Sequence, residues 1–214
     1  MIQIKNLTVK KNKIKILDDL DLQISEGEKI LITGKSGSGK STLLKNILFF
    51  DVKTNGNIFF EGSEVSHKNI GKFRKNIIYI GQKPPTFSGT VEEFLNIPFE
   101  FKSAEGRKPS EDTIIKYLSK VSFGKSILKK NFNSLSGGEQ QRITIIQSLL
   151  INKKIFLLDE ITSSLDEENI RRVIDLFNDE EKTVVAVSHN NEWKNFTDKI
   201  YEMKNGKLIN GIIK

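Results

Sequence analysis

The stretch Ile155-Phe156-Leu157-Leu158-Asp159-Glu160 indicates the fold of this chain. Its four apolar residues follow one another without a break, which is typical of a strand buried on both faces, as in a parallel sheet. Ligands of such sheets bind just beyond the carboxyl ends of the strands, where Asp159 and Glu160 would lie. The two acids could meet a metal ion or a polarised water there, or could simply be solvated acids that end a core strand. The stretch therefore predicts an α/β fold, and the rest of a site has to come from other segments.

A glycine-rich segment lies between a short apolar strand (29–33) and a helical pattern (43–50). In this context its pattern, G-x-x-x-x-G-K-S-T, indicates a phosphate-binding loop rather than a plain glycine-rich turn. The glycines let consecutive backbone N–H groups turn toward phosphate oxygens, and the following helix adds its free N-terminal N–H groups. Lys40 would neutralise the β- and γ-phosphates, and the Ser41 hydroxyl could ligate Mg²⁺. The predicted nucleotide-binding residues of this loop are Gly34, Lys35, Ser36, Gly37, Ser38, Gly39, Lys40, Ser41 and Thr42.

Polar side chains also follow two further strands. The apolar strand 77–80 ends at Gly81-Gln82, and the β-branched strand 183–187 ends at Ser188-His189. A glutamine can ligate Mg²⁺ or hold a water without adding charge, and a histidine can donate to a phosphate oxygen. Each signal is weak alone, because a lone histidine is normally structural. We expect both side chains at the same rim as the two acids, since parallel strands end at one edge of a sheet.

Residues 135–142, Leu-Ser-Gly-Gly-Glu-Gln-Gln-Arg, run into an apolar-periodic helix (143–150). Ser136 and Glu139 fit a capping box, in which serine and glutamate close the first helical turn. The segment could be a helix start and nothing more. However, Gly137 and Gly138 leave backbone N–H groups bare at the positive end of a helix, which predicts a second anion site.

The other patterns predict an antiparallel part and further helices. Alternating apolar residues indicate strands, and the last pair resembles a hairpin around the turn Asn205-Gly206. Asp166 could be the N-cap of the helix predicted over 167–177. The predicted elements are an edge hairpin (strands 2–9 and 16–24), a strand at 57–60, helices over 111–121 and 167–177, and a terminal hairpin over 198–209.

Residues 83–102 combine prolines with four phenylalanines, Phe87, Phe94, Phe99 and Phe101. Core packing is one interpretation of these aromatic side chains. A partly exposed groove for a partner protein is the other, because aromatic residues are enriched at the cores of interfaces.

Composition limits the classes of protein. The chain has 214 residues, of which 37% are hydrophobic and 29% charged, enough for one good core but not for two large domains. It has no cysteine, so disulfides and thiolate metal sites are excluded. No apolar stretch reaches the roughly 18–20 residues of a membrane span, so a role at a membrane would need another chain to cross it. The net charge of +7 comes from lysines spread along the chain, which we interpret mostly as solvated surface.

Six motifs in this order resemble the ATP-binding cassette (ABC) ATPase family over nearly the whole chain. The segment at 135–142 is the most specific of them. They are the phosphate loop Gly34–Thr42, the Q-loop glutamine Gln82, the signature Leu135–Arg142, Walker B Ile155–Glu160, the D-loop Ser163–Asp166 and the switch histidine His189.

The resemblance implies a P-loop NTPase (RecA-like) core with a mixed or parallel sheet, an N-terminal antiparallel β subdomain and an inserted α-helical subdomain. Residues 1–214 would be a single ABC ATPase domain, with the helical subdomain at roughly 83–150. Two such chains would form a head-to-tail dimer around two ATP molecules. Each site would take the phosphate loop of one protomer and the signature helix of the other, which explains two anion sites on one chain.

The resemblance also assigns roles within each site. Ser41 and Gln82 would ligate Mg²⁺, and Asp159 would act on it through water. Glu160 would be the general base that polarises the attacking water, and His189 would stabilise the γ-phosphate. The partner's γ-phosphate would be closed over by the signature residues Ser136, Gly137 and Gly138.

The chain departs from the family at the adenine. The family stacks the base on an aromatic residue of the first hairpin, but no aromatic residue occurs before Phe49. Val9, or one of residues 10–13, would stand at that position. Loss of a stacking contact, worth about 1–3 kcal/mol, predicts weaker discrimination among nucleotides.

Segments 81–91, 96–99 and 158–166 look like stand-alone ATPase subunits of iron or metal exporters. Such a subunit would sit on the cytoplasmic face of the membrane and drive a separate integral membrane permease, whose coupling helix would dock at residues 87–101. No nucleic acid partner is expected. The alternative is a soluble ABC ATPase of DNA repair, translation or Fe–S assembly. The chain has no room for the long insertions of repair ATPases or for a second cassette, and Glu160 and His189 disfavour a sensor without turnover.

Overall fold

Two sheets with a helix between them form the first of two compact units, which comprises residues 1–79, 154–160 and 179–214. The structure is a computed structural model and describes residues 1–50, 55–101 and 107–213. The helices of the first unit are α1 (Lys40–Ile47), α2 (Ile70–Arg74) and α7 (Glu192–Phe196). Its strands are β1 (Ile2–Lys11), β2 (Ile14–Ile24), β3 (Lys29–Thr33), β4 (Asn55–Phe60), β5 (Ser63–Glu64), β6 (Ile77–Ile80, whose last residue begins the second unit), β7 (Ile155–Asp159), β8 (Thr183–Val187), β9 (Lys199–Lys204) and β10 (Lys207–Ile213).

The N-terminal strands form an antiparallel sheet in the order β2-β1-β4-β5. The predicted hairpin is confirmed, since Ile2 pairs with Ile24 and Ile4 with Leu22. Its turn residues Asn12 and Lys13 both have positive φ, the geometry of a tight hairpin turn. Strand β4 adds to the other side of β1, so that β1 lies inside this sheet.

The second sheet has the order β10-β9-β3-β8-β7-β6 and carries the rim predicted from the sequence. Strands β3, β7, β8 and β9 pair in parallel, and β10 runs antiparallel to β9, so the sheet is mixed. Every residue of β7 and of β8 is buried, as their unbroken apolar runs predict. Asp159 pairs with Val187, and Ile32 pairs with the same valine. The carboxyl ends of β3, β7 and β8 therefore meet at one edge.

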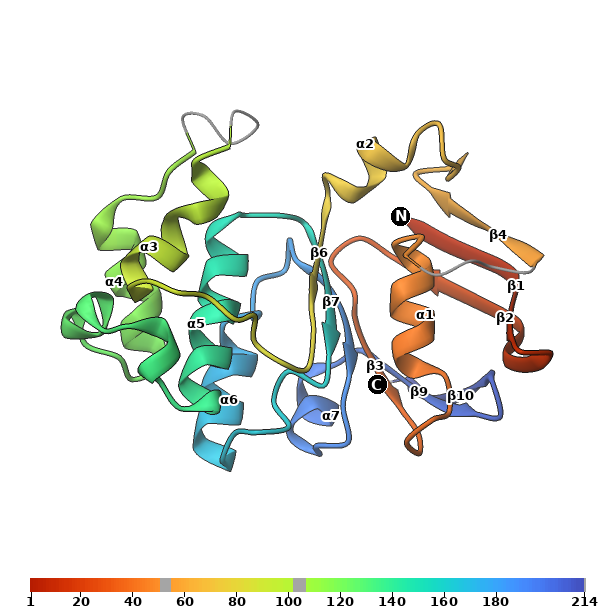
Figure 1. Ribbon diagram of the computed structural model, residues 1–214. Coiled ribbons are helices and arrows are strands. Elements are labelled where there is room, and N and C mark those ends of the chain that lie inside the picture. The colour runs from red at the N-terminus through yellow and green to blue at the C-terminus, as the bar shows by residue number, and fades with distance from the viewer. Residues whose placement is uncertain (51–54, 102–106, 214) are drawn as a thin grey trace. The chain divides into compact units, whose positions relative to one another are not determined.

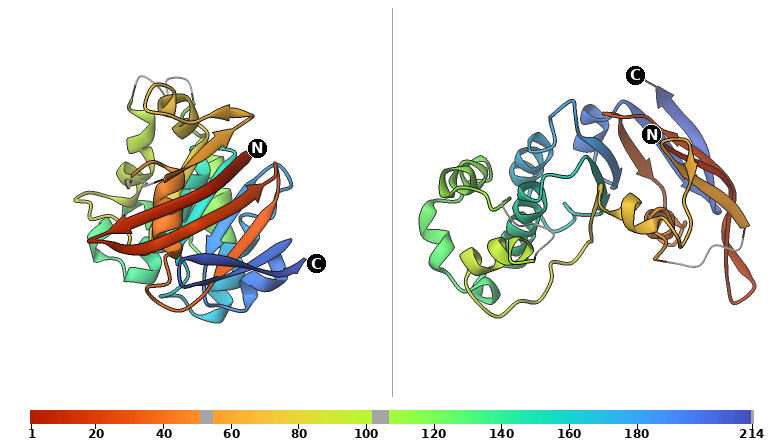
Figure 2. Two further views of the ribbon diagram at one scale, coloured as in Figure 1. Left: turned by 90° about the vertical axis from the view of Figure 1, so that its right-hand side faces the viewer. Right: turned by 90° about the horizontal axis from the view of Figure 1, so that it is seen from above.

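Helix α1 lies between the two sheets, and its apolar side chains join the core that both sheets form (Figures 1 and 2). The helix begins at Lys40 and ends at Ile47, whereas the sequence predicted residues 43–50. It ends early because Phe49 adopts a left-handed φ of 55°. The Arg74 guanidinium donates to the carbonyls of Leu48 and Phe49, which satisfies acceptors left free at the helix end.

The second unit, residues 80–153 and 161–178, is helical. Helix α5 packs against α3 and α4. Helix α5 is the longest described helix of the unit, with 14 residues. Among the described residues, no helix is both long enough and apolar enough to span a membrane. The elements are α3 (Val91–Asn96), α4 (Glu111–Lys120), α5 (Gly137–Leu150), α6 (Glu167–Asp175) and the 3-10 helices η1 (Ile97–Phe99), η3 (Lys125–Lys129) and η4 (Phe132–Ser134).

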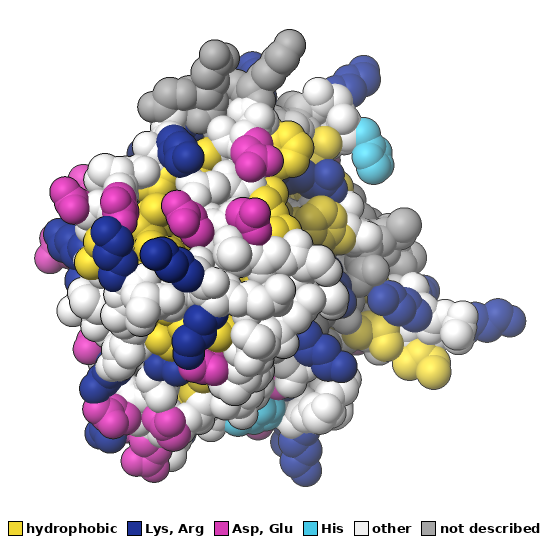
Figure 3. Space-filling view, turned by 60° about the vertical axis from the view of Figure 1, so that its left-hand side comes forward, with side chains coloured by type: hydrophobic (Ala, Val, Ile, Leu, Met, Phe, Trp, Pro, Cys, Tyr) yellow, Lys and Arg dark blue, Asp and Glu magenta, His cyan; other side chains and the backbone are white. Residues whose placement is uncertain are grey.

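The core interpretation of the phenylalanine-rich segment is confirmed for Phe94 and Phe87, whereas the groove for a partner protein stays a prediction. Phe94 is buried and stacks on Phe132 with ring centroids 4.3 Å apart, and Phe87 contacts both rings. Phe101 is 63% exposed. On the face shown in Figure 3, Lys and Arg side chains alternate with Asp and Glu, and apolar side chains show between them. The segment thus contributes both to the core of the second unit and to its surface.

Candidate functional site

The glycine-rich loop connects β3 to α1 at the carboxyl edge of the mixed sheet. Lys40 is only 4% exposed, and its ammonium donates to the carbonyls of Gly34 (2.6 Å) and Lys35 (3.1 Å). The lysine therefore stabilises the loop by hydrogen bonds to two of its carbonyl groups. Gly37 has a left-handed φ of 78°, and a Cβ added there would meet nothing within 4 Å. The loop keeps open space at its crest, where an anion can approach the backbone.

The Ser38 hydroxyl lies inside this loop and is buried without a hydrogen-bond partner among the described residues. A buried, unpaired hydroxyl costs free energy unless a ligand or water satisfies it. Together with the Lys40 ammonium and the free N–H groups at the start of α1, it makes a donor set that suits phosphate. The loop therefore fits the triphosphate that the motif predicts.

Asp159 and Glu160 stand at the end of β7 as predicted. Asp159 is 5% exposed, and its Oδ1 accepts a hydrogen bond of 2.8 Å from the Ser41 hydroxyl. Glu160 takes a left-handed φ of 52°, and its N–H donates to Val187 (2.9 Å). This turn gives the two consecutive acids different surroundings, since Asp159 is buried at the loop and Glu160 is half-exposed at the rim.

Glu160, Lys40 and His189 converge at this rim. Glu160 Oε1 lies 4.0 Å from the Lys40 ammonium and 3.7 Å from His189 Nε2, which is itself 3.4 Å from Lys40. The His189 side chain is 54% exposed, so an incoming ligand can reach it. The structure thus brings together five of the predicted residues, namely Lys40, Ser41, Asp159, Glu160 and His189.

A divalent cation fits this donor set only if phosphate and water complete it. No cluster of three or more His, Asp or Glu side chains suited to a metal lies in the part of the chain that the structure describes. Mg²⁺ does not need such a cage, because it keeps several waters and binds through one or two protein oxygens plus substrate phosphates. The Ser41 hydroxyl and the Asp159 carboxylate, already in contact, supply oxygens of this kind.

Gln82 belongs to the second unit, unlike these five residues. Its side chain is exposed. The carbonyl of the preceding Gly81 accepts a hydrogen bond of 3.2 Å from the buried Gln141 of α5. The role of Gln82 as a magnesium ligand stays a prediction.

The predicted second anion site is the start of α5. The Ser136 hydroxyl accepts from the Glu139 N–H, while the Glu139 carboxylate accepts from the Ser136 N–H (2.8 Å), so the capping box forms. These hydrogen bonds from Ser136 hold the pKa of Glu139 below its ordinary value. A Cβ at Gly138 would lie 3.1 Å from Leu165, but one at Gly137 would meet nothing within 4 Å. Packing within the chain therefore does not require glycine at 137.

Asp166 is the N-cap of α6, as predicted, because its carboxylate accepts from the Asn169 N–H at 2.8 Å. The hydrogen bonds that Asn169 donates keep the pKa of Asp166 below its ordinary value. His67 lies in a polar segment and is exposed, as a surface histidine would be.

A pocket of about 490 Å³ adjoins the phosphate loop. It is lined by Lys35–Ser38, by residues 14–16 of β2 and by the turn between β9 and β10. Val9 is fully buried, which excludes it as the residue that replaces the aromatic base contact. The exposed apolar side chain at this pocket is Ile14, which is 66% exposed. Ile14 lies one residue beyond the range 9–13 that the sequence predicts for this position.

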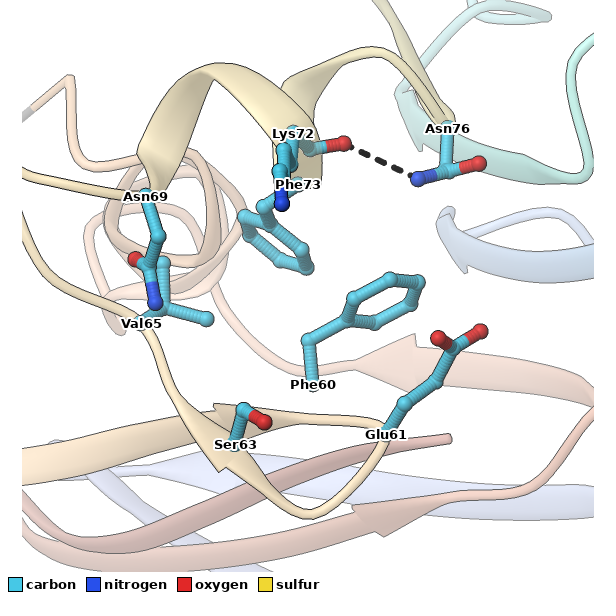
Figure 4. Close-up of a pocket in the computed structure, with 8 residues that line it drawn as sticks. All are labelled: Phe60, Glu61, Ser63, Val65, Asn69, Lys72, Phe73 and Asn76. Carbon is cyan, nitrogen blue, oxygen red and sulfur yellow. Dashed lines mark hydrogen bonds between the residues drawn. The ribbon is translucent and has the colours of Figure 1, made fainter.

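A second pocket of about 440 Å³ shares no residue with the predicted site (Figure 4). The rings of Phe60 and Phe73 lie 5.1 Å apart within it, with Glu61 and Lys72 among its polar residues. Asn76 donates to the Lys72 carbonyl at 3.0 Å. Nothing in this lining resembles the donor set of the phosphate loop.

Tyr79 is a site residue that the sequence reasoning missed. Its hydroxyl donates to Asp159 Oδ2 at 2.8 Å from the neighbouring strand β6. Burial raises the pKa of this phenol well above its usual range. The available signal was a hydroxyl-bearing side chain near the end of an otherwise apolar strand.

Comparison with known proteins agrees with these motifs. Residues 17–163 match the ABC transporter family. The chain is 35% identical over 208 residues to the probable iron export ATP-binding protein FetA of Escherichia coli (strain K12), a match that covers 95% of this chain and 91% of that protein. It is 34% identical over 208 residues to the lipoprotein-releasing system ATP-binding protein LolD of Rickettsia felis, covering 95% and 93%.

Solved structures show the same fold. A dimeric ATP-binding cassette in a post-hydrolysis state, bound to ADP and Pi, matches with a TM-score of 0.84 and 27% identity. The match covers 100% of this chain and 98% of that one. A second dimeric structure, of a bacterial ABC transporter cassette, matches with a TM-score of 0.81 and 29% identity, covering 97% and 96%.

Proposed function

The chain belongs to the ABC transporter family as an ATP-hydrolysing, nucleotide-binding subunit, and we propose that two copies close head-to-tail around two ATP molecules. The observation that carries this proposal is the open space at two places on one chain where an anion is predicted to bind. The phosphate loop has open space at Gly37, and the start of α5 has open space at Gly137. A glycine that no intrachain contact requires suits the close approach of a second chain's nucleotide.

In each site the residues would act as follows. Lys40 holds the β- and γ-phosphates among the backbone N–H groups of residues 34–42. Glu160 takes the proton of the attacking water as general base, and His189 donates to the γ-phosphate. From the partner, the start of α5 at Ser136, Gly137 and Gly138 closes over that phosphate. The Lys40 ammonium lies 4.0 Å and His189 Nε2 3.7 Å from the Glu160 carboxylate, which supports this division of roles.

Mg²⁺ would be held by Ser41 and Gln82 directly and by Asp159 through water. Bound there, it would neutralise charge on the phosphates. Ser41 and Asp159 already place two oxygens side by side, which supports their part of this assignment.

The whole chain would act as one cassette domain, with an inserted helical subdomain at roughly 83–150. The helical character of residues 80–153 supports this boundary.

The subunit would sit at the cytoplasmic face of the membrane and drive a separate permease, with iron or another metal as substrate. FetA is named as a probable iron export protein and LolD as part of a lipoprotein-releasing system, so relatives differ in what they move. The permease would dock at residues 87–101, where exposed Phe101 offers an apolar contact. A soluble ABC ATPase that acts on nucleic acid is the alternative, and the transporter names of the relatives disfavour it.

Glu160→Gln tests the dimer. The substitution removes the base but keeps size, so the variant should bind ATP, dimerise and barely turn over. Light scattering with and without ATP, together with phosphate release, measures this. A variant that stays monomeric at saturating ATP contradicts the sandwich, and one with near-normal turnover shows that Glu160 is not the base. Glu28→Gln is the control, because Glu28 directly precedes the amino end of β3 and so lies away from the carboxyl edge of the sheet.

Affinity purification from membranes tests the partner. Recovery of a multi-span membrane protein supports the transporter subunit. Co-purification of RNA or DNA that salt releases supports the soluble alternative.

A further inference from the structure

Both oxygens of the Asp159 carboxylate are held by hydroxyl groups. Ser41 Oγ donates to Oδ1 and Tyr79 OH donates to Oδ2, each at 2.8 Å. Because the carboxylate is only 5% exposed, these two bonds fix its rotation. The two donors differ in kind: Ser41 belongs to the phosphate loop, whereas Tyr79 belongs to the sheet.

Tyr79 is well anchored for this task. It is half-buried in β6, beside β7 in the sheet, and packs against the hydrophobic core of the first unit. Its hydroxyl donates to Asp159 from the neighbouring strand, and its ring cannot swing away without leaving the core.

We propose that Tyr79 is a positioning residue for the divalent cation, holding Oδ2 of Asp159 so that Oδ1 faces Ser41 and the metal's coordination shell. This inference rests on the proposed roles of Ser41 and Asp159 at Mg²⁺. Groups that hydrogen-bond a metal-binding carboxylate fix its orientation, and their loss typically costs 10–100-fold in metal affinity or activity. Without the phenol, the Asp159 carboxylate would be free to rotate, and the Ser41 hydroxyl would be the one remaining donor of this pair, able to bind either carboxylate oxygen.

Tyr79→Phe is the direct test, because it keeps the ring in the core and removes only the hydroxyl. Mn²⁺ serves as the probe, and its free concentration is measured by electron paramagnetic resonance at saturating ATP, in the Glu160→Gln background that prevents turnover. We expect Mn²⁺ to bind at least tenfold more weakly. ATP affinity in EDTA should stay within twofold. Tyr201→Phe is the matched control, since Tyr201 is also half-buried against the same core but lies in β9.

Asp159→Asn separates the possible results. If it weakens Mn²⁺ binding and Tyr79→Phe does not, the metal site stands and the role of Tyr79 is overturned. If Asp159→Asn has no effect, both are overturned. If Tyr79→Phe weakens ATP binding in EDTA as much as it weakens Mn²⁺ binding, the phenol is merely structural and the proposal fails. The double variant should bind Mn²⁺ no more weakly than Asp159→Asn alone, since the phenol acts through this carboxylate.

Discussion

Nε2 of His189 lies 3.4 Å from the Lys40 ammonium and 3.7 Å from Oε1 of Glu160. The ring nitrogen therefore lies between a cation and a carboxylate, and the tautomer decides whether it accepts from Lys40 or donates to Glu160. A γ-phosphate that enters this rim would meet the Lys40 ammonium and, in the tautomer that is protonated at Nε2, a donor from the ring.

His189→Ala should reduce turnover far more than ATP binding. A donor to charge that develops in the transition state is worth about 10²–10³ in kcat, whereas Lys40 and the loop backbone keep their contacts to the ground-state nucleotide. Phosphate release and a nucleotide titration measure the two effects separately. His67→Ala is the control, because His67 is the other histidine of the chain, is exposed and belongs to none of the six motifs. A kcat within threefold of wild type would exclude His189 from the chemistry.

Gly137→Ala should stabilise the isolated chain and weaken the ATP-driven dimer. The φ of Gly137 is not left-handed and a Cβ there meets nothing within 4 Å, so alanine should add about 0.4–1 kcal/mol to the free energy of unfolding by restricting the unfolded chain. In the dimer, the same methyl group would meet the partner's nucleotide. Urea unfolding without ATP and light scattering with ATP in the Glu160→Gln background give the two measurements.

Gly71→Ala provides the matched control for that experiment. Gly71 is also helical, in α2, and also has open space around its Cβ. It should gain stability to a similar degree and leave the ATP-driven dimer unchanged. If both variants dimerise like the wild type, the start of α5 does not face a nucleotide.

Base recognition should be weak, and Ile14→Tyr should strengthen it. Ile14 is exposed at the pocket beside the phosphate loop, and an aliphatic side chain gives a base no aromatic face. GTP should therefore compete well with ATP in the wild type, and Ile14→Tyr should tighten ATP binding by a stacking contact of about 1–3 kcal/mol. Ile209→Tyr, a comparably exposed isoleucine outside this pocket, is the control. A strong preference of the wild type for ATP over GTP would contradict this reasoning.

The rim of the sheet was predictable because it depends on short local patterns. The unbroken run 155–158 and the β-branched run 183–187 can be buried on both faces only inside a parallel sheet, and parallel strands end together. In such a sheet, the carboxyl ends of β3, β7 and β8 lie side by side, so Asp159, His189 and the loop before α1 lie at the same edge. The capping box at Ser136 was predictable for the same local reason, since its two residues are three apart.

What the sequence could not supply depends on tertiary neighbours. Nothing in the order of residues says that Tyr79 reaches Asp159 across 80 positions, because that contact needs β6 beside β7. The hydrogen bond that caps the early end of α1 likewise comes from a distant residue, Arg74, which reaches back from α2 to the carbonyl of Leu48. Exposure of Ile14 likewise follows from the turn at Asn12, whose positive φ sets the register of the hairpin.

The start of α5 should lose stability in acid through Glu139. Hydrogen bonds from Ser136 lower the pKa of Glu139 in the folded chain below its unfolded value near 4.5. The stabilisation from its ionised form is therefore complete above the unfolded pKa and is lost as the pH falls through the folded pKa. The difference in urea midpoint between wild type and Glu139→Gln should be largest at neutral pH and shrink below about pH 4.5. Ser136→Ala, which keeps the charge but removes one of the donors, should shift the acid limb of the wild-type curve toward higher pH. A midpoint difference that is constant from pH 7 to pH 3 would show that the ionised capping box adds nothing to stability.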